Sequence, residues 1–191
     1  MARQLARLGK SLGVTRRAYT LVEMIIVISI LGIASAIVIP TVGSAGTLRG
    51  QSSVRAVVSD LTFAQSDAMA FQSGRAIVFD VDENRYWVCA VNGPSVDPET
   101  DVLYDTSRDG GIMSLDLDDE MFGLARLESV DIDGGNMIIF DELGAPVNAP
   151  QSNTPSAGGI ITIICEDQRY KITIDGFTGH ITTSRAEIVG P

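Results

Sequence analysis

The sequence predicts an α+β protein, in which one long N-terminal hydrophobic helix packs on an antiparallel β domain. Two observations lead to this class. The first 73 residues hold a continuous apolar segment and then a second segment with apolar residues at helical spacing. Beyond Gly74, apolar residues alternate with polar ones in short runs, separated by turns and by loops rich in proline, glycine and aspartate. Such alternation is typical of antiparallel strands.

The first 18 residues form a basic leader. They contain no acidic residue and five basic ones: Arg3, Arg7, Lys10, Arg16 and Arg17. By the positive-inside rule, such a segment stays on the cytoplasmic side of a membrane. Ala18, a small residue, stands between the leader and the apolar segment, where a cut would remove all five charges. An ordinary secretory signal has its cleavage site after the apolar segment instead.

A single acidic residue, Glu23, interrupts the apolar segment near its start. The 16 residues from Met24 to Ile39 carry no charge, and Pro40 follows them. An ionised side chain inside a bilayer costs roughly 2.5–3.5 kcal/mol on the lenient insertion scale, so an acid at this place indicates a function and a partner. The alternative is a single-pass anchor whose Glu23 lies near the lipid headgroups and is solvated.

The segment RRAYTLVEMIIVISILGIASAIVIP, which ends at Pro40, resembles the N-terminus of the type IV pilin and type II secretion pseudopilin superfamily. In that family a prepilin peptidase cuts on the cytoplasmic side, the new N-terminal residue is N-methylated, and a glutamate follows four residues later. The resemblance implies cleavage between Ala18 and Tyr19, methylation of Tyr19, an assembly role for Glu23 and a helix kink at Pro40. The chain departs from the family in having Ala18 in place of glycine and Tyr19 in place of phenylalanine or methionine.

The resemblance gives Glu23 a physical role. Cleavage would free the α-amino group of Tyr19, and the Glu23 carboxylate could meet that amine on a neighbouring subunit in a bundle of packed helices. Two charges that are each costly in lipid would then neutralise one another, which favours assembly in one register over simple anchoring.

The helical pattern weakens after Pro40 and returns at Gln51. Segment 41–50 contains three glycines, so any helix there is predicted to be weak or locally melted. From Gln51 to Ser73 apolar residues follow a helical period, and Gly74 supplies a plausible C-cap. The resulting stripe consists of Val54, Val57, Leu61, Ala64, Ala68 and Phe71.

The expected organisation has three parts. Residues 1–18 are the leader, and residues 19–50 are the half of the N-terminal helix in the membrane or filament core. Residues 51–191 are a periplasmic globular domain, made of an amphipathic half-helix (51–73) and a β domain (75–191).

Eight runs of the β domain are predicted to be strands. One hairpin joins 75–81 to 85–91, and a second joins 160–166 to 169–174. The remaining strands are expected at 112–117, 124–132, 137–140 and 179–183, with surface loops at 92–111 and 144–159.

The β half also resembles a known group. Its patterns F-D-x-x-G from Phe140 and I-D-x-x-T-G-H-I from Ile174, with AQSDAMAFQSG at the end of the helix, are similar to the GspH/FimT minor pseudopilins and pilins. This resemblance implies a long N-terminal helix packed on an antiparallel, sandwich-like β domain.

The charge of the chain argues against a nucleic-acid partner. The 191 residues include 14 basic and 24 acidic ones, a net charge of −10. Without the leader, 9 basic and 24 acidic residues leave −15. Such a chain repels phosphate, so no nucleic acid is expected to bind, and the acids are expected in solvated loops.

The residue types that carry catalysis or bind metal form no constellation, so no enzyme activity, metal or cofactor is expected. The only histidine, His180, is predicted to be exposed in a turn before a strand. The runs 80–84 and 131–136 faintly resemble calcium loops, but they lack the twelve-residue spacing with a closing glutamate. Turns rich in aspartate and asparagine explain them more simply.

Cys89 and Cys165 are the only cysteines, and strand alternation places both on apolar faces. A disulfide is allowed on the oxidising side of a membrane, and closing the 76-residue interval would stabilise by roughly 4–5 kcal/mol in the chain-entropy model. The sequence leaves open whether they are bridged or are two buried thiols.

The function expected from these resemblances is structural. The chain would be a minor pilin-like subunit of a type II secretion system, anchored by one pass in the bacterial inner membrane with its C-terminal domain in the periplasm. Its partners would be other pilin or pseudopilin subunits, the prepilin peptidase, the inner-membrane assembly platform and the lipid bilayer. The alternatives are a minor type IV pilus subunit of the FimT type, with DNA uptake, and a simple membrane-anchored domain.

Overall fold

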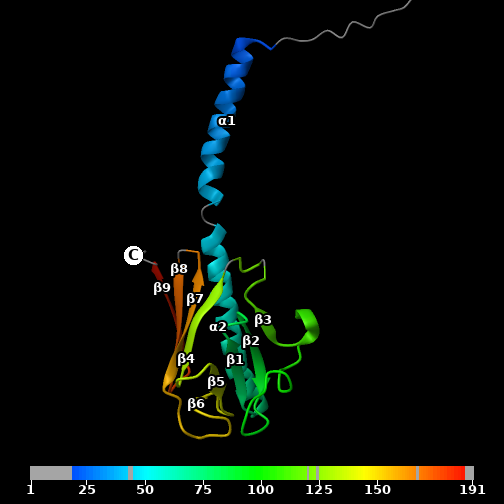
Figure 1. Cartoon of the computed structure of the whole chain (residues 1–191), viewed down its shortest axis with the longest axis vertical. Coiled ribbons are helices and arrows are strands. Elements are labelled where there is room, and N and C mark those ends of the chain that lie inside the picture. Colours follow the sequence, from blue (N-terminus) through cyan, green and yellow to red (C-terminus); the bar gives the residue numbers. More distant parts are fainter. Residues whose placement is uncertain (1–18, 43–44, 120, 124, 167, 188–191) are drawn as a thin grey trace, which may run out of the picture. The chain divides into compact units, whose positions relative to one another are not determined.

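The computed structural model of the protein divides into two compact units, the first up to Val42 in the sequence and the second from Gly43 onward. The structure describes residues 19–42, 45–119, 121–123, 125–166 and 168–187, and for 36–42, 45–47, 109 and 186–187 the backbone only. The leader, including Ala18, therefore lies outside the described residues. The first unit contains α1 (Leu21–Val42), and the second contains α2 (Ala45–Phe71) followed by all the strands (Figure 1).

Helix α2 begins inside the segment in which glycines predicted a weak or melted helix. Gly50 lies in its second turn and is buried. A Cβ at Gly50 would lie 2.8 Å from the Cβ of Cys165 and 3.0 Å from the ring of Tyr170. Glycine therefore lets α2 approach the sheet closely here, and this packing outweighs the low helix propensity of the residue.

The predicted apolar stripe of α2 is buried except at its last member. Val57, Leu61, Ala64 and Ala68 are fully buried and Val54 nearly so, whereas Phe71 is 70% exposed. The expectation for Phe71 is wrong because α2 ends at this residue, before the stripe completes another turn. The Phe71 ring instead lies 5.8 Å from the Arg75 guanidinium, within the range of a cation–π contact.

The end of α2 differs from the prediction that Gly74 caps it. Gln72 has the left-handed backbone (φ 50°), and the Ser73 N–H donates to the Ala68 carbonyl at 3.2 Å. This is the Schellman arrangement, with Gln72 in the place that glycine usually takes. Gly74 serves packing instead, because a Cβ there would lie 3.0 Å from the Cβ of Val91.

The strands form two antiparallel sheets. The five-stranded sheet has the order β3-β2-β1-β5-β6, and the four-stranded sheet has the order β4-β7-β8-β9. The first contains β1 (Arg75–Asp80), β2 (Arg85–Ala90), β3 (Ser114–Asp116), β5 (Met137–Phe140) and β6 (Pro146–Val147). The second contains β4 (Arg126–Ile132), β7 (Gly158–Cys165), β8 (Gln168–Asp175) and β9 (Ile181–Glu187). A 3-10 turn, η1 (Asp109–Gly111), precedes β3.

Both predicted hairpins are present, as β1–β2 and β7–β8. One strand was missed: β6 lies in the predicted loop 144–159, where the Ile139–Val147 pairing adds it to the sheet edge. Its two residues are too few to show an alternating pattern. β9 extends four residues past its predicted end because it pairs along the whole of β8.

Helix α2 packs against both sheets, and a single core joins the three layers (Figure 1). The stripe of α2 meets inward-facing residues of the five-stranded sheet, among them Phe79 and Tyr86, and of the four-stranded sheet, among them Ile163 and Ile172. A smaller cluster of Ala76, Ile139 and Val147 covers the opposite face of the five-stranded sheet. The predicted α+β class, with a helix packed on antiparallel sheets, is confirmed.

Candidate functional site

The N-terminal end of α1 holds the residues for which the sequence predicts processing and assembly. Tyr19 is 74% exposed and precedes the helix, and Glu23 is exposed in its first turn. Thr20 caps the helix, because its Oγ1 accepts the Glu23 N–H at 3.2 Å. Threonine followed three residues later by glutamate is the spacing of a capping box. The cap of the helix is therefore the residue immediately after Tyr19, the expected N-terminus of the processed protein.

The side chains of α1 that the structure describes leave a large apolar surface exposed. Its bulky apolar residues are 45–76% accessible: Leu21, Val22, Met24, Ile25, Ile26, Val27, Ile28, Ile30, Leu31 and Ile33. Its two serines donate to carbonyls of the same helix, Ser29 to Ile25 at 2.7 Å and Ser35 to Leu31 at 2.8 Å. Their hydroxyl groups therefore need no partner outside the helix, which suits an apolar environment.

Within the part of the chain that the structure describes, no helix is long and apolar enough to cross a membrane.

Pro40 lies within α1, two residues before the helix ends at Val42. The side chain of Pro40 is outside the described atoms. The kink expected at this residue stays a prediction.

The two patterns on which the C-terminal resemblance rests form turns of the same design. In F-D-x-x-G, Asp141 Oδ1 accepts the N–H groups of Leu143 at 2.9 Å and Ala145 at 2.8 Å. In I-D-x-x-T-G-H-I, Asp175 Oδ1 accepts the N–H groups of Phe177 and Thr178 and the Thr178 hydroxyl. These bonds, the one from the Thr178 hydroxyl foremost, lower the pKa of Asp175 below its ordinary value.

Both turns meet at one residue of α2. Gln65 Nε2 donates to the Gly144 carbonyl at 2.8 Å and to the Thr178 carbonyl at 3.4 Å. A Cβ at Gly144 would lie 2.8 Å from Met69 Cγ, and one at Gly179 would lie 2.6 Å from Gln65 Nε2. The glycines of both patterns are therefore required for close approach to α2, and they have positive φ values of 78° and 67°.

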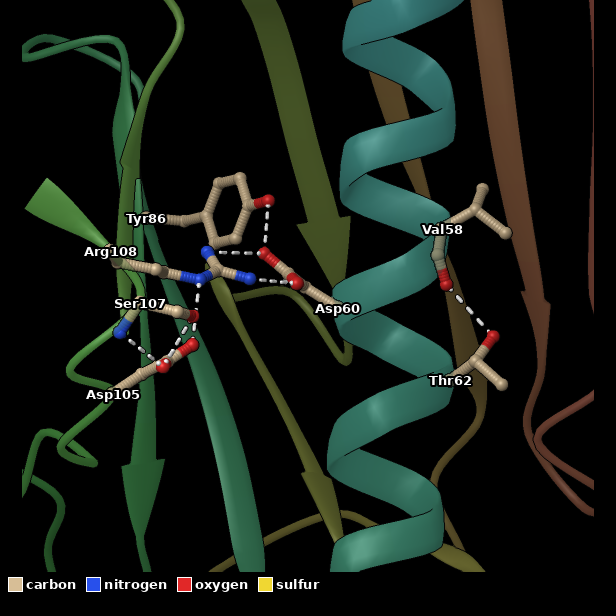
Figure 2. A network of polar contacts seen from close by, with 7 residues as sticks. All are labelled: Val58, Asp60, Thr62, Tyr86, Asp105, Ser107 and Arg108. Atoms are coloured by element: carbon tan, nitrogen blue, oxygen red, sulfur yellow. Dashed lines mark hydrogen bonds and ion pairs between the residues drawn. The ribbon is translucent and has the colours of Figure 1, made fainter. Parts of the chain in front are cut away.

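A buried ionic network fastens the loop before β3 to α2. Asp60 is only 4% exposed, and its Oδ2 accepts the Tyr86 hydroxyl at 2.7 Å and Arg108 Nη1 at 2.9 Å. The second amino group of Arg108 pairs with Asp60 Oδ1, and Asp105 lies 3.5 Å from Arg108 Nε. Figure 2 shows Arg108 reaching from its loop to the carboxylate on the helix, with Tyr86 above the same carboxylate.

This network was not predicted. Burial, and secondarily the Asp60 charge, raises the pKa of Tyr86 well above its ordinary value, so the phenol stays protonated and donates to Asp60. One signal for it exists in the sequence: Asp60 stands three residues after Val57 and beside Leu61, on the apolar side of an amphipathic helix. The partner Arg108 lies in a loop 48 residues away, where no spacing rule reaches.

The aspartate- and asparagine-rich runs serve as turns. Asn84, which is 2% exposed, donates to Asp118 and Ala125 and accepts the Leu127 N–H at 2.8 Å, thus tying the β1–β2 turn to the start of β4. Asp133 accepts the Ser156 hydroxyl and the Ala157 N–H, both at 2.6 Å. Among the residues described, no group of three His, Cys, Asp or Glu is placed to hold a metal ion.

Cys89 and Cys165 are both buried, and no disulfide joins them. They lie on different sheets. Cys89 pairs with Ala76 on the outer face of the five-stranded sheet, whereas Cys165 belongs to the core between the four-stranded sheet and α2. Strand alternation shows that each cysteine lies on an apolar face of its strand. It does not show whether the two cysteines face the same core. Burial raises the pKa of Cys89 from 9.0 to about 12.

His180 is exposed, as expected for a turn histidine, and its backbone N–H donates to Thr178 Oγ1 at 3.2 Å. Its carbonyl accepts the Asp175 N–H at 3.0 Å, which closes the turn before β9. These bonds are structural and bring no nucleophile to the imidazole.

Comparison with known proteins separates the two ends of the chain. Residues 15–39 match the prokaryotic N-terminal methylation motif. The N-terminal segment is of the prepilin type. The match confirms the expected prepilin-type N-terminal segment, and it covers Ala18, Tyr19 and Glu23.

Comparisons of the whole chain add little to this motif. No curated protein matches the chain. Among solved structures, the minor pseudopilin EpsH from the Type 2 Secretion System of Vibrio cholerae is similar, with 10% identity and a TM-score of 0.49 over 74% of this chain and 99% of that one. A similarity at this level does not by itself assign a function.

Proposed function

We propose that this prepilin-type chain is a minor pseudopilin of a type II secretion system, cut by a prepilin peptidase and assembled into a short periplasmic filament. The observation that carries the proposal is that the methylation motif and the start of an apolar helix coincide next to Tyr19. The methylation motif spans residues 15–39, and the helix in it begins with the Thr20 cap, directly after Tyr19. A cut before Tyr19 would thus release a free amine at the very start of an apolar helix.

The exposed apolar residues of α1 support the same role. A contiguous apolar surface of this kind needs to be covered in an aqueous compartment. We propose that the bilayer covers it before assembly and the helices of neighbouring subunits cover it afterwards. The leader would stay in the cytoplasm, and residues 43–191 would lie in the periplasm.

The DNA-uptake alternative is disfavoured by where the cations lie. Nine basic residues follow the leader. Four of them already form ion pairs with carboxylates: Arg75, Arg85, Arg108 and Arg169. Affinity for duplex DNA comes mainly from neutralising phosphates with lysine and arginine. We therefore expect no salt-sensitive DNA binding at physiological salt, and gel-shift titrations at several salt concentrations check this.

The decisive experiment is N-terminal mass analysis of the protein extracted from membranes of a host with its prepilin peptidase. We expect a chain that begins at Tyr19 and carries one added methyl group. A matched pair of variants isolates the cleavage position. Ala18→Gly restores the residue typical of the family and should be processed at least as well, whereas Ala18→Arg keeps the leader basic but places a bulky residue at the cut and should block it.

An unprocessed leader in the wild-type protein, or a cut after Ala36, would contradict the proposal. Correct cleavage with no incorporation into a filament containing other pseudopilins would retain the processing but remove the structural role. In that case the chain would be a processed membrane-anchored domain.

A further inference from the structure

A groove of about 690 Å³ lies on the outer face of the five-stranded sheet. Val78 and Trp87, neighbours in the β1–β2 pairing, line it on the sheet side. Tyr104 lines it from the loop that follows β2, and its side chain is 86% exposed. Two aromatic side chains thus face a solvent-open groove, although neither belongs to the main core.

The rim of the groove is acidic. Asp80, Glu83, Asp97 and Glu99 line it, against a single cation, Arg85. Arg85 is already neutralised, because it lies 3.4 Å from Glu83 and 3.3 Å from Asp116. Within the described residues, the carboxylates of Asp80, Asp97 and Glu99 have no cationic partner. The groove therefore has an excess of negative charge beside its aromatic surface.

The chemistry of a suitable ligand follows from these two properties. The face of a tryptophan ring attracts cations, and guanidinium groups stack on it more readily than ammonium groups do. The protein illustrates this itself, since the Arg85 guanidinium lies 5.9 Å from the centre of the Trp87 ring. A second copy of the chain is a poor occupant, because the processed protein would carry −15 and repel itself.

We propose that this groove binds an arginine-bearing extended segment of a different, basic polypeptide. The arginine side chain would stack between Trp87 and Tyr104, and its charge would be balanced by Asp97 and Glu99. The inference does not depend on the proposed filament role, because binding at the groove can be measured without assembly or processing.

The test uses the full-length protein in detergent micelles and a blocked Gly-Arg-Gly-Arg-Gly peptide. The chain has a single tryptophan, Trp87, so its fluorescence reports on the groove alone. We expect a saturable change in emission with the arginine peptide. The same peptide with citrulline, which is isosteric and uncharged, should bind at least about tenfold more weakly.

Variants separate the groove from general attraction to an acidic protein. Asp97→Asn combined with Glu99→Gln should weaken binding by about three- to tenfold, since each exposed charge contributes modestly. Asn keeps the oxygen that accepts the Glu99 N–H at 2.9 Å, so the turn is preserved. The matched control is Asp131→Asn with Glu166→Gln, which removes the same charge from two exposed positions, one in β4 and one in the β7–β8 turn. This control should change affinity less than about twofold.

Tyr104→Ala retains the tryptophan reporter and removes an exposed side chain. This variant should fold normally and bind the arginine peptide more weakly than the wild type. Three results would overturn the proposal: equal binding of the citrulline peptide, equal weakening by the control pair, or no saturable change in emission together with no heat of binding by calorimetry.

Discussion

Gln65, in the middle of α2, donates a hydrogen bond of 2.8 Å to the carbonyl of Gly144, which lies 79 residues further along the chain. The same amide nitrogen lies 3.4 Å from the Thr178 carbonyl, 113 residues away. One helical side chain thus holds the β5–β6 turn of one sheet and the β8–β9 turn of the other. In each pattern the aspartate accepts N–H groups of its own turn, and the glycine lets the turn approach α2.

The glycines in these turns should be sensitive to substitution. Gly144→Ala forces a side chain into a left-handed position (φ 78°), 2.8 Å from Met69 Cγ. We expect a loss of about 1–3 kcal/mol in the free energy of unfolding. Gly93→Ala is the control, because no atom lies within 4 Å of the added Cβ. Urea denaturation followed by tryptophan fluorescence measures both, and equal stability of the two variants would contradict the turn assignment.

Removing one partner from the ionic network at Asp60 should strongly destabilise the folded protein. Arg108→Ala leaves a nearly buried carboxylate without its cation. We expect the free energy of unfolding to fall by about 2–4 kcal/mol, which is less than for a fully buried pair because Arg108 is partly exposed. Arg169→Ala removes a solvent-exposed pair with Glu128, and it should lower the free energy of unfolding much less than Arg108→Ala does. Thermal unfolding of the two variants side by side gives the comparison. A smaller effect at Arg108 than at Arg169 would show that the network is dispensable.

Stability should fall as the pH rises above about 9. The pKa of Cys89 is raised from 9.0 to about 12 in the folded protein, and that of Tyr86 is also raised. The unfolded chain therefore loses these protons first, and the free energy of unfolding decreases with pH between the unfolded and folded pKa values. Cys89→Ala should flatten the decline between pH 9 and 12 in denaturation curves. A slope identical to the wild type would exclude a contribution from this thiol.

The same burial makes a prediction for cysteine chemistry. Neither thiol should react with iodoacetamide in the native protein at pH 8, because alkylation requires an accessible thiolate. Both should react after denaturation without a reductant, since no disulfide joins them. Mass analysis counts the added groups. A denatured protein that becomes alkylated only after reduction would reveal a bridge.

The role of Glu23 can be separated from its place in the capping spacing. Glu23→Gln keeps a residue suited to the capping box but removes the charge, and Glu23→Ala removes both. Both variants should still enter the membrane, because loss of a charge favours lipid. If the carboxylate pairs with the Tyr19 amine of a neighbour, both should crosslink into filaments far less than the wild type. Normal assembly of Glu23→Gln alone would show that the cap, and not the charge, is what matters.

Local patterns in the sequence were enough to predict the order and type of most helices and strands. The patterns that predicted them depend only on residues that are near one another in the chain. They are the continuous apolar run, the helical spacing from Val54 to Ala68 and the alternation in both hairpins. The prepilin-type segment could also be recognised from the sequence, because Ala18 and Glu23 lie within the short stretch that the methylation motif matches.

Contacts between residues that are distant in the chain could not be predicted in this way. Helix α2 continues through Gly50, although glycine has a low helix propensity. The absence of a side chain lets the helix pack closely on Cys165, and this packing stabilises it. The Asp60–Arg108 ion pair and the placement of the two cysteines on different sheets both depend on how the two sheets pack around α2. Periodicity assigns a residue to a face, whereas the partner across that face is set by the packing of layers that are far apart in the chain.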